Sequence, residues 1–208
     1  MAALFRKPKR PSVKASSPHA VGAPFVVGIA GGSASGKSTL CAALAERLQG
    51  ISVLEFHMDE YFKPNREKPQ SKSPLSGKIY TDDNHPDTMD IARLAANVRE
   101  AQTSGAAQVI LVEGLLTLWS DALCDLLHLK IFVDCRADER IVRRLKRNMQ
   151  WGQSFDEVSA VYLDLVRFRH DEYVEPSKWR ADIIVNGAQL TQTALDMLCG
   201  HIEKNAKG

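Results

Sequence analysis

A short glycine-rich segment, residues 31–38 (GGSASGKS), constrains this chain more than any other feature. It follows an apolar run at Phe25–Ala30 that predicts a buried strand, and it precedes a helical pattern that opens at Lys37. Glycine lets the backbone turn tightly enough for several N–H groups to point at one phosphate chain, and the helix adds its positive end. The spacing matches G-x-x-x-x-G-K-[ST], the phosphate-binding P-loop, and its place between a strand and a helix argues against a chance turn.

In a P-loop the lysine, here Lys37, reaches the β- and γ-phosphates of ATP, and the next hydroxyl, here Ser38, coordinates Mg²⁺. We therefore predict that ATP and Mg²⁺ are the cofactors. We also expect Lys37 to face solvent in the free protein. The residues expected to bind the nucleotide are Gly31, Gly32, Ser33, Ala34, Ser35, Gly36, Lys37, Ser38 and Thr39.

Five short apolar runs alternate with helical patterns along the chain. This alternation predicts an α/β P-loop fold with a five-stranded parallel sheet, helices on both faces and a helical lid near residues 143–155. The expected strands are residues 25–30, 51–56, 109–112, 130–134 and 182–185. The expected helices after the one at Lys37 are residues 88–103, 119–127, 138–149, 155–173 and 190–204. Residues 61–87 are polar and rich in proline and lysine, which predicts a loop-rich insertion with one short helix.

Charge and composition limit the other classes of function. Residues 1–24 hold five basic residues and no acid, which predicts a basic tail before a kinase domain at 25–208. That domain is then mildly acidic, so neither nucleic acid nor a membrane is an expected partner, and no apolar run is long enough to span a bilayer. Four cysteines without metal-ligand spacing predict reduced thiols and a cytoplasmic location. Organelle targeting by the tail and a homo-oligomeric state stay open.

Two acidic residues follow predicted strands, which places both at the edge of the sheet where ligands bind. Asp59 follows the second strand, where a carboxylate would face the γ-phosphate and accept a proton from an attacking hydroxyl. Glu113 ends the third strand and is placed to hold Mg²⁺, so Ser38, Asp59 and Glu113 form the predicted metal site. A helix N-cap at Asp59 and a solvated strand end at Glu113 are the alternatives without function.

Four arginines recur at helical spacing in the predicted lid. They are Arg140, Arg143, Arg144 and Arg147, and the opposite face expected to pack on the core carries Ile141, Val142, Leu145 and Met149. A charge run is most often a solvated face. Like charges at this spacing, however, destabilise a helix by roughly 0.2–0.5 kcal/mol per pair. A bound phosphate chain would remove that cost.

With these residues in place, the chain resembles the phosphoribulokinase and uridine kinase family, nearest to its uridine kinase branch. The segments that carry the resemblance are GIAGGSASGKST, MDEYF, NHPDTMD, VEGLLTLWSD, IFVDCRADERIVRRLKRN and YVEPSKWRADIIVNGA, in family order. The resemblance implies that Asp59 and Lys37 are catalytic, with Arg144 and Arg147 as lid arginines, and that Asn186–Ala188 contact adenine. It also implies substrate contacts at Asp59, Tyr61, Asn84, His85 and Arg167. For the segment at His85 the equal alternative is structural: Asp87 caps the next helix and Pro86 rigidifies its entry.

Three departures from the family pattern bear on the phosphate acceptor. Asn84 stands where uridine kinases carry an Asp before H-P-D, and the lid turn reads Trp151-Gly152-Gln153 in place of an R-G-R-like sequence. Only Thr103–Gln108 connects the helix after H-P-D to the next strand, which leaves no room there for a base-reading hairpin. Another segment, Lys63–Asp83, is long enough to supply a substitute wall.

We therefore predict a kinase that transfers the γ-phosphoryl group of ATP to the 5′-hydroxyl of a uridine- or cytidine-like nucleoside. Two alternatives stay open. One is a kinase for another small alcohol, such as nicotinamide riboside or pantothenate. The other is a nucleotide-binding regulator without turnover, against which the presence of Asp59, Glu113 and Arg144 argues.

Overall fold

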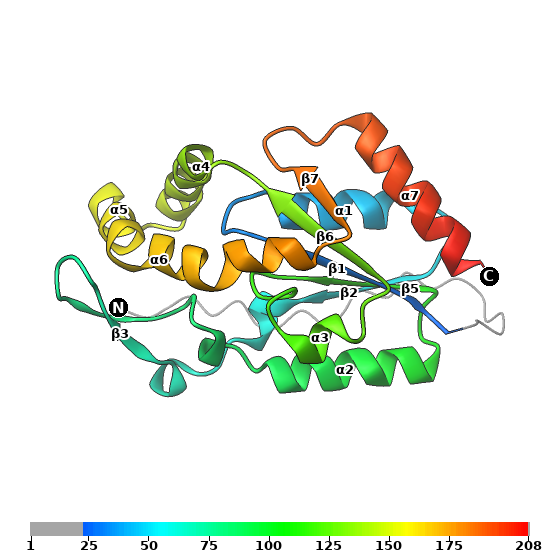
Figure 1. Cartoon of the computed structure of the whole chain (residues 1–208), viewed down its shortest axis with the longest axis horizontal. Helices are drawn as coiled ribbons and strands as arrows, with labels where there is room; N and C mark the ends of the chain where they lie inside the picture. Colours follow the sequence, from blue (N-terminus) through cyan, green and yellow to red (C-terminus); the bar gives the residue numbers. More distant parts are fainter. Residues whose placement is uncertain (1–22, 208) are drawn as a thin grey trace.

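Residues 23–207 are described by the computed structural model (Figure 1). The predicted basic tail at residues 1–24 lies almost entirely outside this range, as does Gly208. None of the helices within residues 23–207 has the length and apolar character that crossing a bilayer requires.

The central sheet has five strands in the order β2-β5-β1-β6-β7, and all neighbouring strands are parallel. These strands are β1 (Phe25–Gly31), β2 (Val53–His57), β5 (Val109–Glu113), β6 (Leu129–Asp134) and β7 (Ile183–Asn186). One face is covered by α1 (Lys37–Arg47) and α7 (Gln192–Ala206), the other by α2 (Ile91–Ser104) and α3 (Asp121–Cys124) (Figure 1). The predicted five-stranded parallel sheet with helices on both faces is confirmed.

The register of the sheet aligns the carboxyl ends of its strands. Ile29 of β1 pairs with Glu113 of β5, and Glu113 pairs in turn with His57 of β2. On the other side, Asp134 of β6 pairs with Asn186 of β7. The P-loop, both predicted acids and the predicted adenine turn therefore lie along one edge, where ligands bind in parallel sheets.

The helices that follow β6 form the lid region. Helix α4 (Ala137–Gln150) leads through a turn into α5 (Phe155–Val161) and α6 (Arg167–Arg169). Two π-helical turns, Tyr162–Val166 and His170–Val174, connect these pieces into one helical path that ends before Pro176. The extent predicted for this helix, 155–173, is confirmed, but its regular α-helical character is not. Such π turns interrupt helices at functional sites in many proteins.

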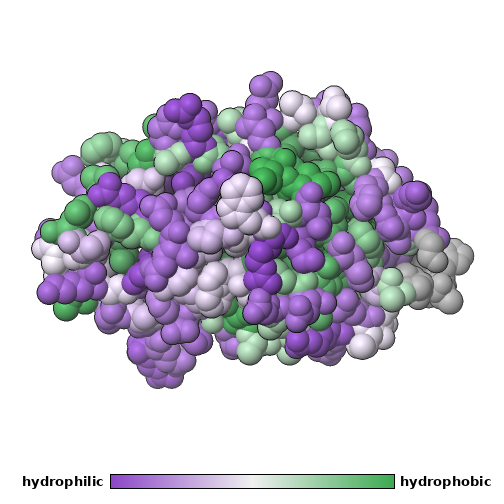
Figure 2. Space-filling view, viewed as in Figure 1, coloured by the Kyte–Doolittle hydropathy of each residue, from purple (hydrophilic) through white to green (hydrophobic). Residues whose placement is uncertain are grey.

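Helix α4 is rotated from the predicted orientation, although Ile141 and Leu145 of the predicted inner face are still half-buried. Arg140 and Asn148 are buried, whereas Val142 and Met149 are each 49% exposed. Figure 2 shows hydrophobic residues on the surface at this end of the molecule, among hydrophilic ones. The prediction failed because α4 covers the P-loop and not the sheet. The P-loop offers hydroxyl and carbonyl oxygens, which match guanidinium groups better than methyl groups.

The insertion predicted as loop-rich contains a β-hairpin. Strands β3 (Gln70–Lys72) and β4 (Ile79–Thr81) pair antiparallel, and short 3₁₀ turns lie on either side of them. Strands of three residues leave too little alternation for a sequence pattern to reveal. An isolated two-stranded hairpin is marginally stable, so this one depends on contacts with the rest of the chain.

Candidate active site

The P-loop leaves β1 and wraps around the start of α1. Gly36, the N-cap of α1, has φ 103°, and Ala34 has φ 63°, so both adopt left-handed backbone. The Ser35 N–H donates to the Gly32 carbonyl at 3.0 Å and closes the turn. Within the described chain no side chain caps the start of α1, so its first N–H groups are available to a phosphate.

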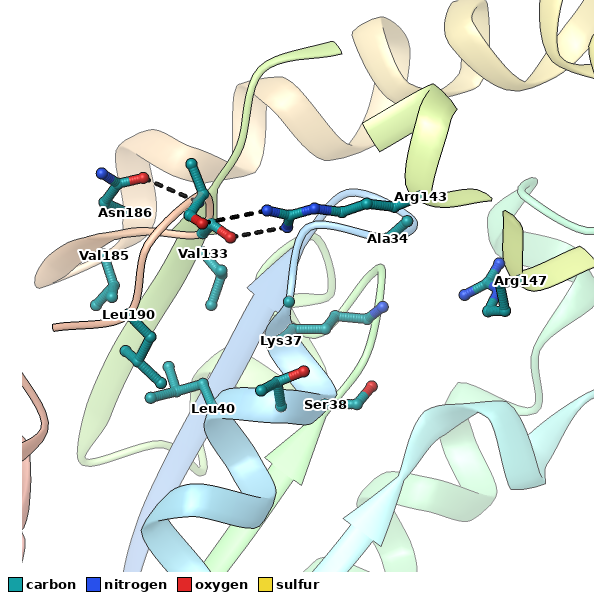
Figure 3. A pocket seen from close by; sticks show the side chains of 14 residues that line it. Ala34, Lys37, Ser38, Leu40, Val133, Arg143, Arg147, Val185, Asn186 and Leu190 are labelled. Atoms are coloured by element: carbon teal, nitrogen blue, oxygen red, sulfur yellow. Dashed lines mark hydrogen bonds between the residues drawn. The ribbon is translucent and has the colours of Figure 1, made fainter. Parts of the chain in front are cut away.

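Lys37 lies deeper than we expected. It is only 9% exposed, so the prediction that it faces solvent is wrong. Its side chain points into a cavity opposite Arg147 (Figure 3), and it lines a second cavity on its other side. Lys37 therefore lines both cavities, next to the place where a phosphate held by the loop would lie.

A buried carboxylate, Glu113, lies next to the first turn of α1. Its Oε1 accepts a hydrogen bond from the Ser38 hydroxyl at 3.2 Å and lies 3.0 Å from Nδ1 of His57. Burial alone would raise the pKa of Glu113, but the His57 hydrogen bond and the charge of Lys37 outweigh it and hold that pKa below its ordinary value. The hydrogen bond to Glu113 raises the pKa of His57, while burial opposes the shift. His57 was missed by the sequence analysis, although its place at the end of β2 was a signal.

This cluster fits Mg²⁺. The Oε2 atom of Glu113 is buried and has no hydrogen-bond partner among residues 23–207. Mg²⁺ prefers oxygen ligands and commonly takes one or two from the protein, with water and substrate phosphates supplying the rest. Asp59, predicted as a third ligand, forms no hydrogen bond to Ser38 or Glu113 in the described structure and belongs to the second cavity instead.

Two lid arginines converge on one P-loop hydroxyl. Arg144 and Arg147 donate to Oγ of Ser33 at 2.9 and 3.3 Å. Burial and the neighbouring charge of Arg147 lower the pKa of Arg144. Burial also lowers the pKa of Arg147, and the charge of Asp59 partly offsets that effect. Two partly buried cations side by side repel one another, so an anion bound between them and the loop would be stabilised.

The first cavity has a volume of ≈ 540 Å³ and extends from the P-loop to the turn after β7. Arg143 closes this end by donating to the carbonyls of Gly187 and Ala188 at 2.8 and 3.2 Å (Figure 3). Asn186 fixes the same turn, because its Oδ1 accepts the Ala188 N–H at 2.9 Å. The predicted adenine turn thus lines the same cavity as the P-loop. Arg143 was not among the predicted site residues.

The second cavity has a volume of ≈ 410 Å³ and opens beyond Lys37 and Arg147, which line both hollows. Asp59 and Asn84, both predicted substrate contacts, line it together with Arg144. Asp59 follows β2 in a 3₁₀ turn and, among residues 23–207, accepts no side-chain hydrogen bond. Its carboxylate is exposed and free to contact a ligand.

The structure does not bring the other three predicted substrate residues to this cavity. Tyr61 is 7% exposed in the core, where its hydroxyl accepts from Asn97 at 2.9 Å. His85 packs edge-on against Tyr173 and itself caps the 3₁₀ turn Pro86–Thr88 by accepting the Asp87 N–H, whereas Asp87 was the cap predicted as the alternative. Arg167 lines a separate hollow and donates to a carbonyl one turn back in its own helix. These positions depend on tertiary packing, which no local sequence pattern reports.

The wall residues that the sequence analysis did not predict as site residues come from the hairpin and the residues after it, from the lid turn and from α5. The additional wall residues are Tyr80, Thr81, Asp83, Trp151, Gln153 and Glu157. The connection after α2 is short, as predicted, but the hairpin β3–β4 supplies a wall in its place. The Tyr80 hydroxyl donates to Asp164 at 2.7 Å, and Arg169 pairs with Asp82 at 2.7 Å, so the lid helices hold the hairpin over the cavity.

A P-loop at the edge of a parallel sheet, a buried carboxylate beside its serine and an arginine-bearing lid define a P-loop kinase. Solved structures with this fold include a putative fructose transport system kinase from Silicibacter sp. TM1040 (TM-score 0.57, 18% identity, covering 78% of this chain and 90% of that one). Another is a possible uridine kinase from Bacillus stearothermophilus (TM-score 0.55, 20% identity, covering 79% and 90%).

Residues 76–194 match the model of the Phosphoribulokinase / Uridine kinase family. A uridine kinase from Deinococcus deserti is 34% identical over 202 residues, which cover 86% of this chain and 95% of the relative. One from Clostridium tetani is 31% identical over 204 residues, covering 87% and 95%. The chain therefore belongs to the Phosphoribulokinase / Uridine kinase family and is a phosphotransferase, as the resemblance implied.

Proposed function

We propose that this protein is an ATP-dependent nucleoside kinase that phosphorylates the 5′-hydroxyl of uridine or a similar riboside, with Mg²⁺ as cofactor. The observation that carries the proposal is the meeting of two cavities at Lys37 and Arg147. One cavity contains the P-loop and the turn at Asn186, and the other contains Asp59. A kinase needs two ligands held end to end, with the transferred phosphoryl group between them.

On the nucleotide side, the N–H groups of the P-loop and the start of α1 would hold the β- and γ-phosphates, and Lys37 would neutralise them. The Ser38 hydroxyl and the Glu113 carboxylate would hold Mg²⁺, which when bound supplies positive charge to the phosphate oxygens. The adenine ring would lie against the apolar part of this cavity, between Val185 and Leu190.

On the acceptor side, Asp59 would take the proton of the attacking hydroxyl. The acceptor oxygen then forms a bond to the γ-phosphorus, the bond from that phosphorus to the β,γ-bridging oxygen breaks, and ADP leaves. Arg144 and Arg147 would transfer hydrogen bonds from Ser33 to the moving phosphoryl group, where charge develops in the transition state. With α4 and α5 over the site, the lid would exclude water and suppress hydrolysis of ATP.

The nucleoside acceptor is supported by the relatives, which are named uridine kinases. Asn84 would hydrogen-bond a sugar hydroxyl, because it lines the second cavity and its amide can both donate and accept. The cavity also carries apolar and aromatic side chains suited to the faces of a planar ring, among them Phe62, Tyr80 and Trp151.

The test is an ADP-release assay with wild-type protein and Asp59→Asn over uridine, cytidine, adenosine, nicotinamide riboside and pantothenate. We expect release that depends on a riboside and on Mg²⁺ and that is lost in the variant. A preference for pantothenate would point to another small alcohol as the acceptor. ATP binding without acceptor-dependent ADP release across the whole panel would contradict the proposal and favour a regulator without turnover.

A further inference from the structure

Trp151 terminates α4 at the rim of the second cavity. Its N–H donates to the Asn148 carbonyl at 3.0 Å, and the N–H of Gln153 returns to the same carbonyl at 3.2 Å. Gly152 has φ 90°, a left-handed value that lets the chain reverse between them. The side chain of Asn148 also donates to Gln153 at 2.7 Å. These bonds fix the turn, and with it the position from which the indole leaves the backbone.

The indole ring has a cation beside it and is otherwise largely exposed. The guanidinium of Arg147 lies 4.9 Å from the ring centroid, at a cation–π distance. Arg147 is itself fixed by hydrogen bonds to Ser33 and Asn148. Trp151 as a whole is nevertheless 67% exposed. A large apolar ring that a neighbouring cation contacts and that is still mostly uncovered is a surface on which a ligand gains by stacking.

The open ring belongs to the acceptor cavity. Trp151 lines the second cavity and is absent from the wall of the first, so it does not serve the nucleotide side. The same cavity carries apolar side chains from other elements, including Tyr80 of the hairpin and Val158 of α5. Asp59 lies in this cavity too, so an acceptor that presents its hydroxyl there has its remaining atoms within the same walls.

We propose that Trp151 is a specificity-determining residue, on which the planar ring of the acceptor stacks while its hydroxyl faces Asp59. The inference rests on the proposed function, since it assumes that the second cavity holds the acceptor. Stacking uses the π-face of a ring, which all nucleobases share, and is therefore tolerant of the particular base. The protein should favour ring-bearing ribosides over ring-free sugars and discriminate weakly among the rings.

The test compares the full-length variants Trp151→Ala, Trp151→Phe and Trp179→Ala. Trp179 is a matched control, because it is 81% exposed and has Lys178 Nζ 5.8 Å from its ring centroid, yet lines neither cavity. ADP release is measured against uridine, adenosine, nicotinamide riboside and ribose. We expect Trp151→Ala to raise KM for the three ribosides about 10-fold or more and to leave ribose nearly unchanged. Trp151→Phe, which keeps a ring, should restore most of the loss, and Trp179→Ala should match wild type.

A second readout is tryptophan emission during titration with uridine in the absence of ATP. The emission change expected in wild type should be retained in Trp179→Phe and lost in Trp151→Phe. If ribose is not a substrate, this readout tests the role of Trp151 in place of the KM comparison. An equal rise of KM for ribose and ribosides, no rise for any of them, or an undiminished emission change in Trp151→Phe would overturn the role of Trp151. An emission change from Trp151 without any ADP release would support stacking and contradict the proposed kinase activity.

Discussion

The ion pair between Arg169 and Asp82 fastens the hairpin to the lid helices, and its two partners are unequally buried. The Asp82 side chain is fully buried and that of Arg169 is 20% exposed, with Nε and Oδ2 2.7 Å apart. Arg169 also donates to Ser71 at 2.9 Å and pairs with Glu172, whereas the only other hydrogen bond to the Asp82 carboxylate among the described residues is from the Asn84 N–H at 3.1 Å. Substituting Arg169 and substituting Asp82 should therefore lower the free energy of unfolding by different amounts.

We expect Arg169→Met to lower the free energy of unfolding by about 3 kcal/mol, because it leaves a fully buried carboxylate without its cation. Asp82→Asn should cost about 1.5 kcal/mol, since an amide can still accept the hydrogen bond and Arg169 keeps Glu172 and some water. For a domain of this size, the larger change lowers Tm by about 6–12 °C. Because the hairpin lines the second cavity, which the proposed function assigns to the acceptor, KM for uridine should rise as well, while ATP binding stays unchanged.

The assay is urea denaturation followed by circular dichroism, with hydrogen exchange across residues 70–82 to detect detachment of the hairpin alone. Arg136→Met provides the control, because Arg136 pairs with Asp138 on the surface and its side chain is 81% exposed. Such a pair contributes about 0.5 kcal/mol or less. If Arg169→Met matched this control in both measurements, or if Asp82→Asn were the more damaging change, the argument from unequal burial would be refuted.

Three further outcomes follow from the site. Asp59→Asn should lower kcat at least about 100-fold with ATP binding retained by calorimetry, and more than a tenth of wild-type activity would place the base elsewhere. Glu113→Gln should raise the Mg²⁺ concentration for half-maximal activity about 10-fold, and an unchanged Mg²⁺ titration would argue against its role. Burial and the charge of Arg140 lower the pKa of His170 below its ordinary 6.5, although Glu175 and Asp171 oppose this. Below that pH the unfolded chain takes up a proton that the folded one resists, so stability should fall with acidification. His170→Asn should flatten this loss between pH 7 and 5 in denaturation curves, and an unaltered slope would contradict the assignment.

The sequence alone was enough to predict the parallel sheet, the P-loop and the acidic residues at the strand ends. The strand runs are apolar because both faces of a parallel sheet are covered, and the glycine pattern at residues 31–38 has few uses besides phosphate binding. Asp59 and Glu113 could be placed because strand ends in such a sheet meet at one edge, and the register bears this out for Glu113 and His57. These inferences depend on local pattern and on a topology that allows few alternatives.

Only the tertiary structure decided which side chains surround the second cavity. Arg169 pairs with Asp82 across 87 positions of sequence, and Tyr80 reaches Asp164 across 84, so no local window contains either contact. The direction of α4 likewise depended on what it covers: its hydrophobic pattern predicted packing on the core, but the polar P-loop beneath it received the arginines. Amphipathic spacing shows that a helix has an apolar and a polar face. The chemistry of the neighbouring element determines which of the two faces packs against it.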